Sequence, residues 1–121
     1  MNDNYATDNS IMQIFEGWFD PCPLNPDYET DALSIEWKDK TYVNPPYSKP
    51  LPFVLKAIEE NKKGKRIVML LRMDTSTKWF KELQENGAIF LWVNGRLRFN
   101  TGKPANFPSM LAILYNKQEN V

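Results

Sequence analysis

The apolar residues of this chain fall into short blocks whose spacing alternates between strand and helix periods. A β-favouring block at 41–43 and continuous apolar blocks at 67–71 and 88–93 indicate strands. Between them, apolar side chains recur every three to four residues up to about Lys62 and again over 78–86, which indicates amphipathic helices. The sequence therefore predicts an α/β fold in which strands and helices alternate.

Further elements complete this pattern at both ends of the chain. They are a short helix at 11–17, a short strand at 18–19, a helical turn or short strand within 31–37, and a last strand at 110–115. Asn94-Gly95 is a hairpin signal that predicts an antiparallel strand at 96–99. We therefore expect one domain over 1–121, with a small Rossmann-like sheet that is mostly parallel and ends in an antiparallel hairpin.

Local signals indicate where the two main helices begin and end. Pro50 or Pro52 suits the start of the first helix. The basic cluster 62–65, which includes a glycine, suits its solvated end. Thr75 or Ser76 is expected to cap the second helix.

Composition narrows the chemistry that this chain can perform. The sequence contains no histidine and a single cysteine, Cys22, which excludes Ser-His-Asp and Cys-His mechanisms, Cys/His zinc sites and an internal disulfide. No metal is expected, and the absence of a long apolar run predicts a cytoplasmic protein. Residues 1–39 carry nine acidic residues and one basic residue, whereas most basic residues follow. This asymmetry fits either a nucleic-acid-facing half or two halves that pair with each other.

The segment 44–47, Asn-Pro-Pro-Tyr, follows directly on a predicted strand. Because Pro45 and Pro46 cannot donate to a ladder and hold the chain extended, the strand stops there and a stiff loop begins. Such a loop lies at the carboxyl end of its strand, where ligands bind in open α/β sheets. Two other readings stay open: a turn that only ends the strand, and a proline-rich docking segment that continues to Pro52.

This loop offers groups that can hold an amino group on a flat ring. The Asn44 side-chain oxygen and the Pro45 carbonyl can accept both amino hydrogens. The Tyr47 ring can stack on the face of the same base. These contacts would orient the amine lone pair toward an electrophile without a strong base.

Several short segments match a known pattern in order and spacing. They are 18–23 (Trp-Phe-Asp-Pro-Cys-Pro), 43–48 (Val-Asn-Pro-Pro-Tyr-Ser), Leu70-Leu71 with 74–80, 95–99 (Gly-Arg-Leu-Arg-Phe) and Phe107-Pro108-Ser109. Together they resemble the phage-type DNA N-6-adenine methyltransferase family, related to the Dam enzymes, over roughly residues 7–115. Three departures stand out. The chain lacks the Gly-x-Gly loop with which a wider class of methyltransferases wraps the methionine part of the cofactor, and Asp8 and Arg72 stand where the family usually has proline.

The resemblance implies S-adenosylmethionine as methyl donor and the amino group of adenine in DNA as acceptor. It implies a catalytic loop made of Asn44, Pro45, Pro46 and Tyr47, and cofactor contacts from Asp20, Pro21, Cys22 and, more loosely, Thr7 and Ile11. Asp31 is a further cofactor candidate, as a ribose ligand by analogy with dinucleotide sites, although a helix cap is its alternative role. The expected reaction is direct methyl transfer to an adenine flipped out of the duplex.

Candidate DNA contacts come from polar and basic residues near these segments. They are Ser48, Lys49, Arg72, Arg96 and Arg98. For Arg96 and Arg98, an exposed hairpin face is an equally open explanation. A homodimer or partner subunit is expected to supply target recognition, since no separate region for it is visible. Other acceptors, RNA adenine or protein glutamine, and a non-catalytic subunit remain alternatives; a phage-encoded enzyme would act in the host cytoplasm.

Overall fold

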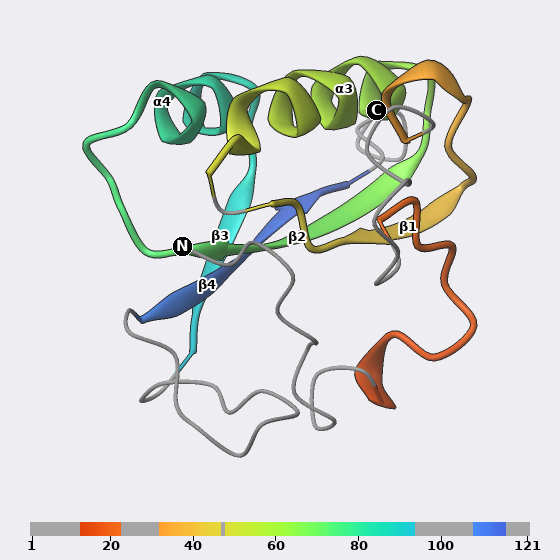
Figure 1. Cartoon of the computed structure of the whole chain (residues 1–121), viewed down its shortest axis with the longest axis horizontal. Helices are drawn as coiled ribbons and strands as arrows, with labels where there is room; N and C mark the ends of the chain where they lie inside the picture. The colour runs from red at the N-terminus through yellow and green to blue at the C-terminus, as the bar shows by residue number, and fades with distance from the viewer. Residues whose placement is uncertain (1–12, 23–31, 47, 94–107, 116–121) are drawn as a thin grey trace.

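A four-stranded sheet with two helices on one face makes up most of the part of the chain that the computed structural model describes (Figure 1). The described residues are 13–22, 32–46, 48–93 and 108–115. In chain order the named elements are β1 (Lys40–Val43), α3 (Pro50–Lys62), β2 (Arg66–Arg72), α4 (Lys78–Glu85), β3 (Ile89–Trp92) and β4 (Ser109–Leu114).

The strands lie in the order β1-β2-β4-β3. β1 pairs with β2 in parallel, and α3 provides the crossover between them, whereas β4 pairs antiparallel with both β2 and β3. The sheet is therefore mixed and only partly parallel, where the sequence predicted a mostly parallel one. The apolar run in β2 shows only that this strand is buried on both faces, and such burial occurs whether its neighbours run parallel or antiparallel. The predicted strand at 96–99 lies outside the described residues.

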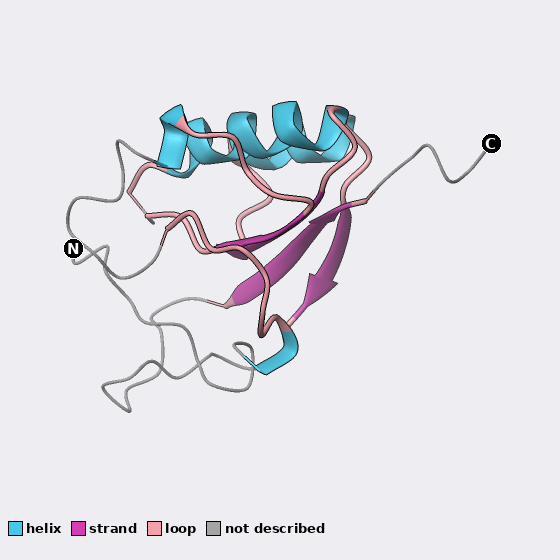
Figure 2. Cartoon of the chain, turned by 90° about the vertical axis from the view of Figure 1, so that its right-hand side faces the viewer, coloured by secondary structure: helices cyan, strands magenta, loops and turns pink. Residues whose placement is uncertain are grey.

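The two faces of the sheet are covered differently (Figure 2). α3 and α4 pack on one face, over a core that includes Val43, Met69 and Leu71. On the opposite face, the buried side chains are Tyr42, Val68, Leu70 and Leu111, against which Phe15, Trp18, Val93 and Ile113 pack. We call this second side the open face, because no long helix covers it in the described residues. Strand alternation decides which side chains reach it.

The predicted helices and strands are largely confirmed, with differences at their ends. Residues 32–34 form the helical turn that was one of two alternatives for that region, and only 13–14 are helical in the described part of the first predicted helix. The cap of α4 is Thr77, whose hydroxyl accepts a hydrogen bond from the Phe80 N–H at 3.2 Å. The prediction of Thr75 or Ser76 is therefore wrong, because Ser76 instead bonds to Asp74.

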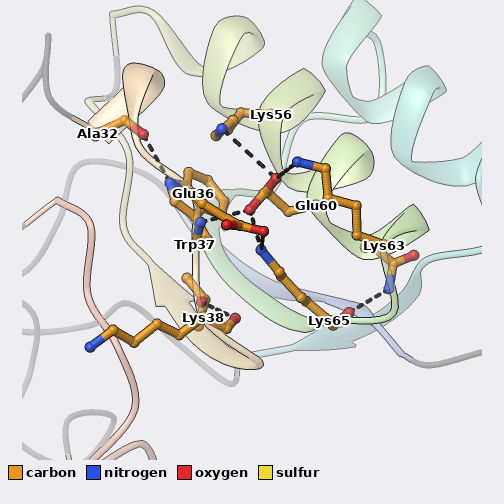
Figure 3. A network of polar contacts seen from close by, with 10 residues as sticks. Ala32, Glu36, Trp37, Lys38, Lys56, Glu60, Lys63 and Lys65 are labelled. Atoms are coloured by element: carbon orange, nitrogen blue, oxygen red, sulfur yellow. Dashed lines mark hydrogen bonds and ion pairs between the residues drawn. The ribbon is translucent and has the colours of Figure 1, made fainter.

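A buried carboxylate, Glu60, organises the end of α3 (Figure 3). Its side chain is fully buried, and its oxygens contact Lys65 at 2.7 Å, Lys63 at 2.9 Å and Lys56 at 3.8 Å. It also accepts a 2.6 Å hydrogen bond from the backbone N–H of Trp37, 23 residues earlier. The basic cluster at the end of α3 is therefore not simply a solvated helix end, because two of its lysines neutralise a buried charge.

The Glu60 contacts fix the segment that leads into β1. The Trp37 indole donates to the Ala32 carbonyl at 2.9 Å, which closes the 32–37 turn over α3. Lys65 also bonds Glu36 at 3.0 Å, so this cation joins the acidic first part of the chain to the basic remainder. Burial on its own would raise the pKa of Glu60, but the hydrogen bonds from Lys65, Lys63 and the Trp37 backbone, with the charge of Lys56, lower it to about 2.

Replacing Glu60 by glutamine should destabilise the protein in a pH-dependent way. The folded-state pKa of Glu60 is lowered to about 2 from its ordinary 4.5, so its stabilising contribution is present above pH 4.5 and is lost as the pH falls toward 2. At pH 7 we expect Glu60→Gln to lower the free energy of unfolding by on the order of 3 kcal/mol. Urea unfolding measured from pH 7 to pH 2.5 checks this.

The exposed neighbour Glu59, also on α3, provides the matched control. Glu59→Gln removes the same charge from the same helix but should change the free energy of unfolding by less than about 0.5 kcal/mol. A Glu60→Gln variant that unfolds with the wild-type pH profile would contradict the role given to this carboxylate.

Candidate active site

A one-residue strand extends the sheet beyond β1. The Phe19 N–H donates to the Lys40 carbonyl and the Tyr42 N–H donates to the Phe19 carbonyl, both at 2.9 Å, which makes a parallel bridge between Phe19 and Thr41. The predicted strand at 18–19 is therefore present as this single bridge. In this register Asp20 lies next to Tyr42, at the same end of the sheet as the Asn-Pro-Pro-Tyr loop.

Strand alternation places polar groups from several strands on the open face at this end of the sheet. Tyr42 is buried on that face, so Asn44, two residues later, follows on the same side. In β2 the same alternation takes Leu70 to Arg72, and in β4 it takes Leu111 back to Ser109. The carboxyl edge of the open face thus carries Asp20, Asn44, Arg72 and Ser109, in the order of their strands.

A cavity of about 560 Å³ opens beside Asp20 on this face. It is lined by Gln13, Phe15, Glu16, Gly17, Trp18, Asp20 and Tyr42. Phe15 stacks on the Tyr42 ring at 4.7 Å and meets Trp18 edge-on at 5.2 Å, so three aromatic rings form one wall. The cavity therefore combines aromatic surface with carboxylates, a combination suited to a flat or cationic ligand.

Gly17 forms a turn at the rim of this cavity. Gly17 has a φ of +85°, a conformation that L side chains rarely adopt. A Cβ added at this position would meet nothing within 4 Å, so the glycine borders open space. The turn at Gly17 also reverses the chain between Phe15 and Trp18, which brings both rings to Tyr42.

Asp20 is the partly desolvated charge of the cavity. Burial raises its pKa above the ordinary value, and the hydrogen bond from the Cys22 N–H, at 2.9 Å, opposes that rise. Pro21 and Cys22 are themselves buried behind it. The predicted Asp20-Pro21-Cys22 segment therefore presents Asp20 to the cavity, while its two neighbours hold the backbone in place.

The described part of the Asn-Pro-Pro-Tyr loop is firmly seated. Pro45 and Pro46 are buried and Asn44 is half-buried. The Pro46 carbonyl accepts from the Lys49 N–H at 3.2 Å, and α3 begins at Pro50. Ser48 and Lys49 are exposed beside this turn. The described part of the loop thus leads out of β1 through Asn44 and two buried prolines toward the start of α3.

Arg72 follows the last buried position of β2 and is tied to the next loop. One guanidinium nitrogen lies 3.4 Å from the Asp74 carboxylate. Asp74 in turn accepts hydrogen bonds from the Ser76 hydroxyl at 2.6 Å and the Ser76 N–H at 3.1 Å. These two bonds, with the charge of Arg72, lower the pKa of Asp74, so a charged pair is fixed at this edge.

Several predicted site residues lie outside the described residues. They are Thr7, Ile11, Asp31, Tyr47, Arg96 and Arg98. Of the others, the structure brings Asp20, Asn44 and Arg72 to one edge and one face of the sheet. The acidic and aromatic groups of the cavity are therefore next to the strand that carries the Asn-Pro-Pro-Tyr loop.

Sequence reasoning did not assign Phe15, Gly17 or Tyr42 to the site. Phe15 and Tyr42 read as core positions of a helix and a strand, and Gly17 stood alone without a glycine-rich motif. The sequence offered one indication that these residues belong to the site: they lie within five residues of Asp20 or Asn44. Their convergence depends on the Phe19 bridge and on the turn at Gly17, which the pattern of residues does not reveal.

Comparison with known proteins identifies a family that covers nearly the whole chain. The profile of the DNA N-6-adenine-methyltransferase (Dam) family matches residues 6–118. No solved structure matches the chain significantly. In the described residues, no helix is both long and apolar enough to cross a membrane.

Two curated relatives are phage proteins. The chain is 39% identical over 98 residues to the DNA N-6-adenine-methyltransferase of Haemophilus phage HP1, and 45% identical over 71 residues to that of Escherichia phage T1. These alignments cover 74% and 57% of this chain, and 57% and 30% of the two relatives. The resemblance in the sequence is thereby confirmed: the chain belongs to the DNA N-6-adenine-methyltransferase (Dam) family.

Proposed function

We propose that this chain catalyses the transfer of a methyl group from S-adenosylmethionine to the exocyclic amino group of adenine in DNA. The observation that carries the proposal is the placement of Asp20 and Asn44 on the same face at neighbouring strand ends, beside a cavity of about 560 Å³. The relatives are named for this activity, and the chain spans 57% and 30% of their lengths.

The residues around the cavity fit S-adenosylmethionine. A volume of about 560 Å³ is within the range of small-molecule pockets. The rings of Phe15, Trp18 and Tyr42 would hold a flat base or a sulfonium cation by stacking and cation–π attraction. Asp20 would pair with an ammonium group or accept from a ribose hydroxyl. When bound, S-adenosylmethionine supplies an electrophilic methyl group.

The groups of the loop would act on the acceptor. The Asn44 side-chain oxygen and the Pro45 carbonyl would accept the two amino hydrogens, which exposes the nitrogen lone pair. Because Asn44 belongs to the half-buried bend after β1, these acceptors would be held in place before the base arrives. Positioning and electrostatics then supply the rate enhancement, without a general base.

DNA would approach from the end of the sheet that carries this loop. The target adenine would be flipped out of the duplex, at a cost of a few kcal/mol in lost stacking, and Tyr47 would stack on it. Ser48 and Lys49, both exposed at the start of α3, would contact phosphates, as would Arg96 and Arg98. Thr7 and Ile11 would contact the cofactor, and Asp31 would bind its ribose.

The proposal includes a Rossmann-like core and a second subunit. Support for the core comes from the parallel run from the Phe19 bridge through β1 to β2, with α3 as the crossover. Support for a second subunit comes from the edge strand β3, because an exposed apolar edge strand can pair with another chain. Its side chains Ile89, Leu91 and Trp92 are 49%, 50% and 57% exposed. The second subunit is either another copy of this chain or a different partner. Sedimentation at rising protein concentration tests the homodimer, and a monomer throughout would contradict it.

Substitution of Asn44 tests the catalytic role of the loop. Asn44→Ala removes an acceptor for the amino group, so methyl transfer should fall by at least about 100-fold. The affinity for S-adenosylmethionine, measured by calorimetry, should stay within about two-fold of wild type. Labelled methyl transfer to double-stranded DNA, to RNA and to a protein lysate provides the activity measurement and compares the acceptors.

The outcome separates the parts of the proposal. Wild-type transfer to RNA or protein in place of DNA would reject the acceptor, and undiminished transfer by Asn44→Ala would reject the role of the loop. If the wild-type protein binds no S-adenosylmethionine at millimolar concentration, the enzymatic function itself is refuted.

The pH dependence of cofactor affinity should report Asp20. Burial raises the pKa of this carboxyl, and only its ionised form attracts a cation. Affinity for S-adenosylmethionine should therefore fall as the pH drops through the raised pKa, and it should fall only weakly in Asp20→Asn. At neutral pH we expect Asp20→Asn to bind about 10-fold more weakly.

Glu16 lines the same cavity through an exposed side chain and serves as control. Glu16→Gln should change the affinity by less than about three-fold, since a solvated charge contributes little. Identical titrations of affinity against pH for wild type and Asp20→Asn would exclude Asp20 from the cofactor site.

A further inference from the structure

In the part of the chain that the structure describes, two buried polar atoms at the carboxyl edge of β2 and the start of β4 have no hydrogen-bond partner. They are the Ser109 hydroxyl oxygen and the Arg72 Nε. Ser109 is fully buried, and the buried Nε belongs to a residue whose guanidinium end is partly exposed. A buried donor left unpaired costs free energy in the folded protein. Such atoms therefore indicate a place that a ligand or water completes.

The backbone holds both residues rigidly side by side. Arg72 and Ser109 are direct partners in the antiparallel pairing of β2 with β4. The next backbone bond, from the Met73 N–H to the Pro108 carbonyl, is 2.8 Å long. On the other side of β4, the Ser109 carbonyl accepts from the Val93 N–H at 3.2 Å. Cross-strand partners project on the same face, so the two side chains are neighbours.

Arg72 and Ser109 lie on the open face at its carboxyl edge, as Asn44 does. Alternation from Leu70 and Leu111 places Arg72 and Ser109 on the open face. Across the sheet, the Asp20 cavity lies on the outer side of β1, Asn44 at its end, and the Arg72–Ser109 pair beyond it on β2 and β4. Asn44 thus stands between the cavity and this pair. A group held by Asn44 on the side away from the cavity would face both donors.

We propose that Arg72 Nε and Ser109 Oγ donate hydrogen bonds to a ring nitrogen of the target adenine, next to the amino group held by Asn44. This inference rests on the proposed function, since it assigns the acceptor side of the same site. N1 and N7 both flank the amino group of adenine, and each is an acceptor with one lone pair, which the two adjacent donors would share in a bifurcated hydrogen bond. The pair would thereby select adenine by its ring edge.

The charges at this edge favour a neutral base over a phosphate. The Arg72 guanidinium is already paired with the Asp74 carboxylate at 3.4 Å, and two bonds from Ser76 hold that carboxylate in place. A phosphate there would meet the Asp74 charge and would have to be desolvated to reach a fully buried hydroxyl. A ring nitrogen carries no charge and needs only donors.

The test compares two variants with a control on the same strand. Ser109→Ala removes one donor and Arg72→Met removes the other while keeping an apolar stem. Arg66→Met removes an exposed arginine from the opposite end of β2. Methyl transfer is measured on duplex DNA made with adenine or with 7-deazaadenine throughout. Calorimetry measures binding of adenosine, 1-deazaadenosine and 7-deazaadenosine to the same proteins.

We expect Ser109→Ala and Arg72→Met each to lower kcat/KM on adenine DNA by about 10-fold. Wild type should bind one of the two deaza analogues about 10-fold more weakly than adenosine, because that analogue lacks the ring nitrogen that accepts the hydrogen bonds. Each variant should bind that analogue no more weakly than it binds adenosine. If that nitrogen is N7, the transfer assay should repeat the pattern. Arg66→Met should behave as wild type. Ser109→Ala should melt no lower than wild type, because its hydroxyl has no hydrogen-bond partner among the described residues.

Other outcomes overturn the inference. Equal kcat/KM for Ser109→Ala and wild type would do so. A second contradicting result would come from Arg72→Met. If it lowers kcat/KM equally on adenine DNA and 7-deazaadenine DNA, and also reduces the slope of log affinity against log salt concentration by about one, Arg72 contacts a phosphate. If wild type methylates no DNA, the proposed function fails and adenosine binding decides this inference. About 10-fold weaker adenosine binding by Ser109→Ala would uphold the subsite, and equal or absent binding would refute it.

Discussion

The buried carboxylate of Glu60 is the constraint on which the arrangement of the chain around β1 depends. A fully buried charge is tolerated only with full compensation, and here it receives Lys63, Lys65 and the Trp37 N–H at 2.9 Å or less. These contacts join α3, the turn before β2 and the segment before β1. β1 is therefore held at both ends, by this network before it and by buried prolines after it. The position of Asn44, directly after β1, is fixed by the same contacts.

The position of β1 also decides which groups meet at the candidate site. Its outer edge takes the Phe19 bridge, which brings Asp20 and the aromatic wall of the cavity to Tyr42. Its inner edge pairs with β2, which leads to Arg72 and on to Ser109 in β4. β1 therefore lies between a charged, aromatic cavity and, among the described residues, two buried hydrogen-bond donors without a partner. The proposed function assigns the cavity to the methyl donor and these two groups to the acceptor base.

The mixed sheet is part of this arrangement. Had the sheet been mostly parallel, a further strand ending at this edge would have lain beside β2. Instead β4 runs antiparallel and begins there, so its first residue, Ser109, is placed between β2 and β3. The edge strand β3 remains half-exposed and apolar. In the described residues, the same topology thus places a buried hydroxyl at the carboxyl edge of the open face and makes β3 the edge strand.

The sequence by itself determined the helices, most of the strands and the loop after β1, because periodicity and proline act locally. It also determined the family, through short segments in the right order. Only the tertiary structure decided that the basic cluster after α3 serves a buried glutamate, that Phe15 and Gly17 line a cavity with Asp20, and that Ser109 stands beside Arg72. Those outcomes depend on strand direction, register and the side of the sheet that each residue faces. They arise from pairings between residues far apart in the chain, which local patterns do not encode.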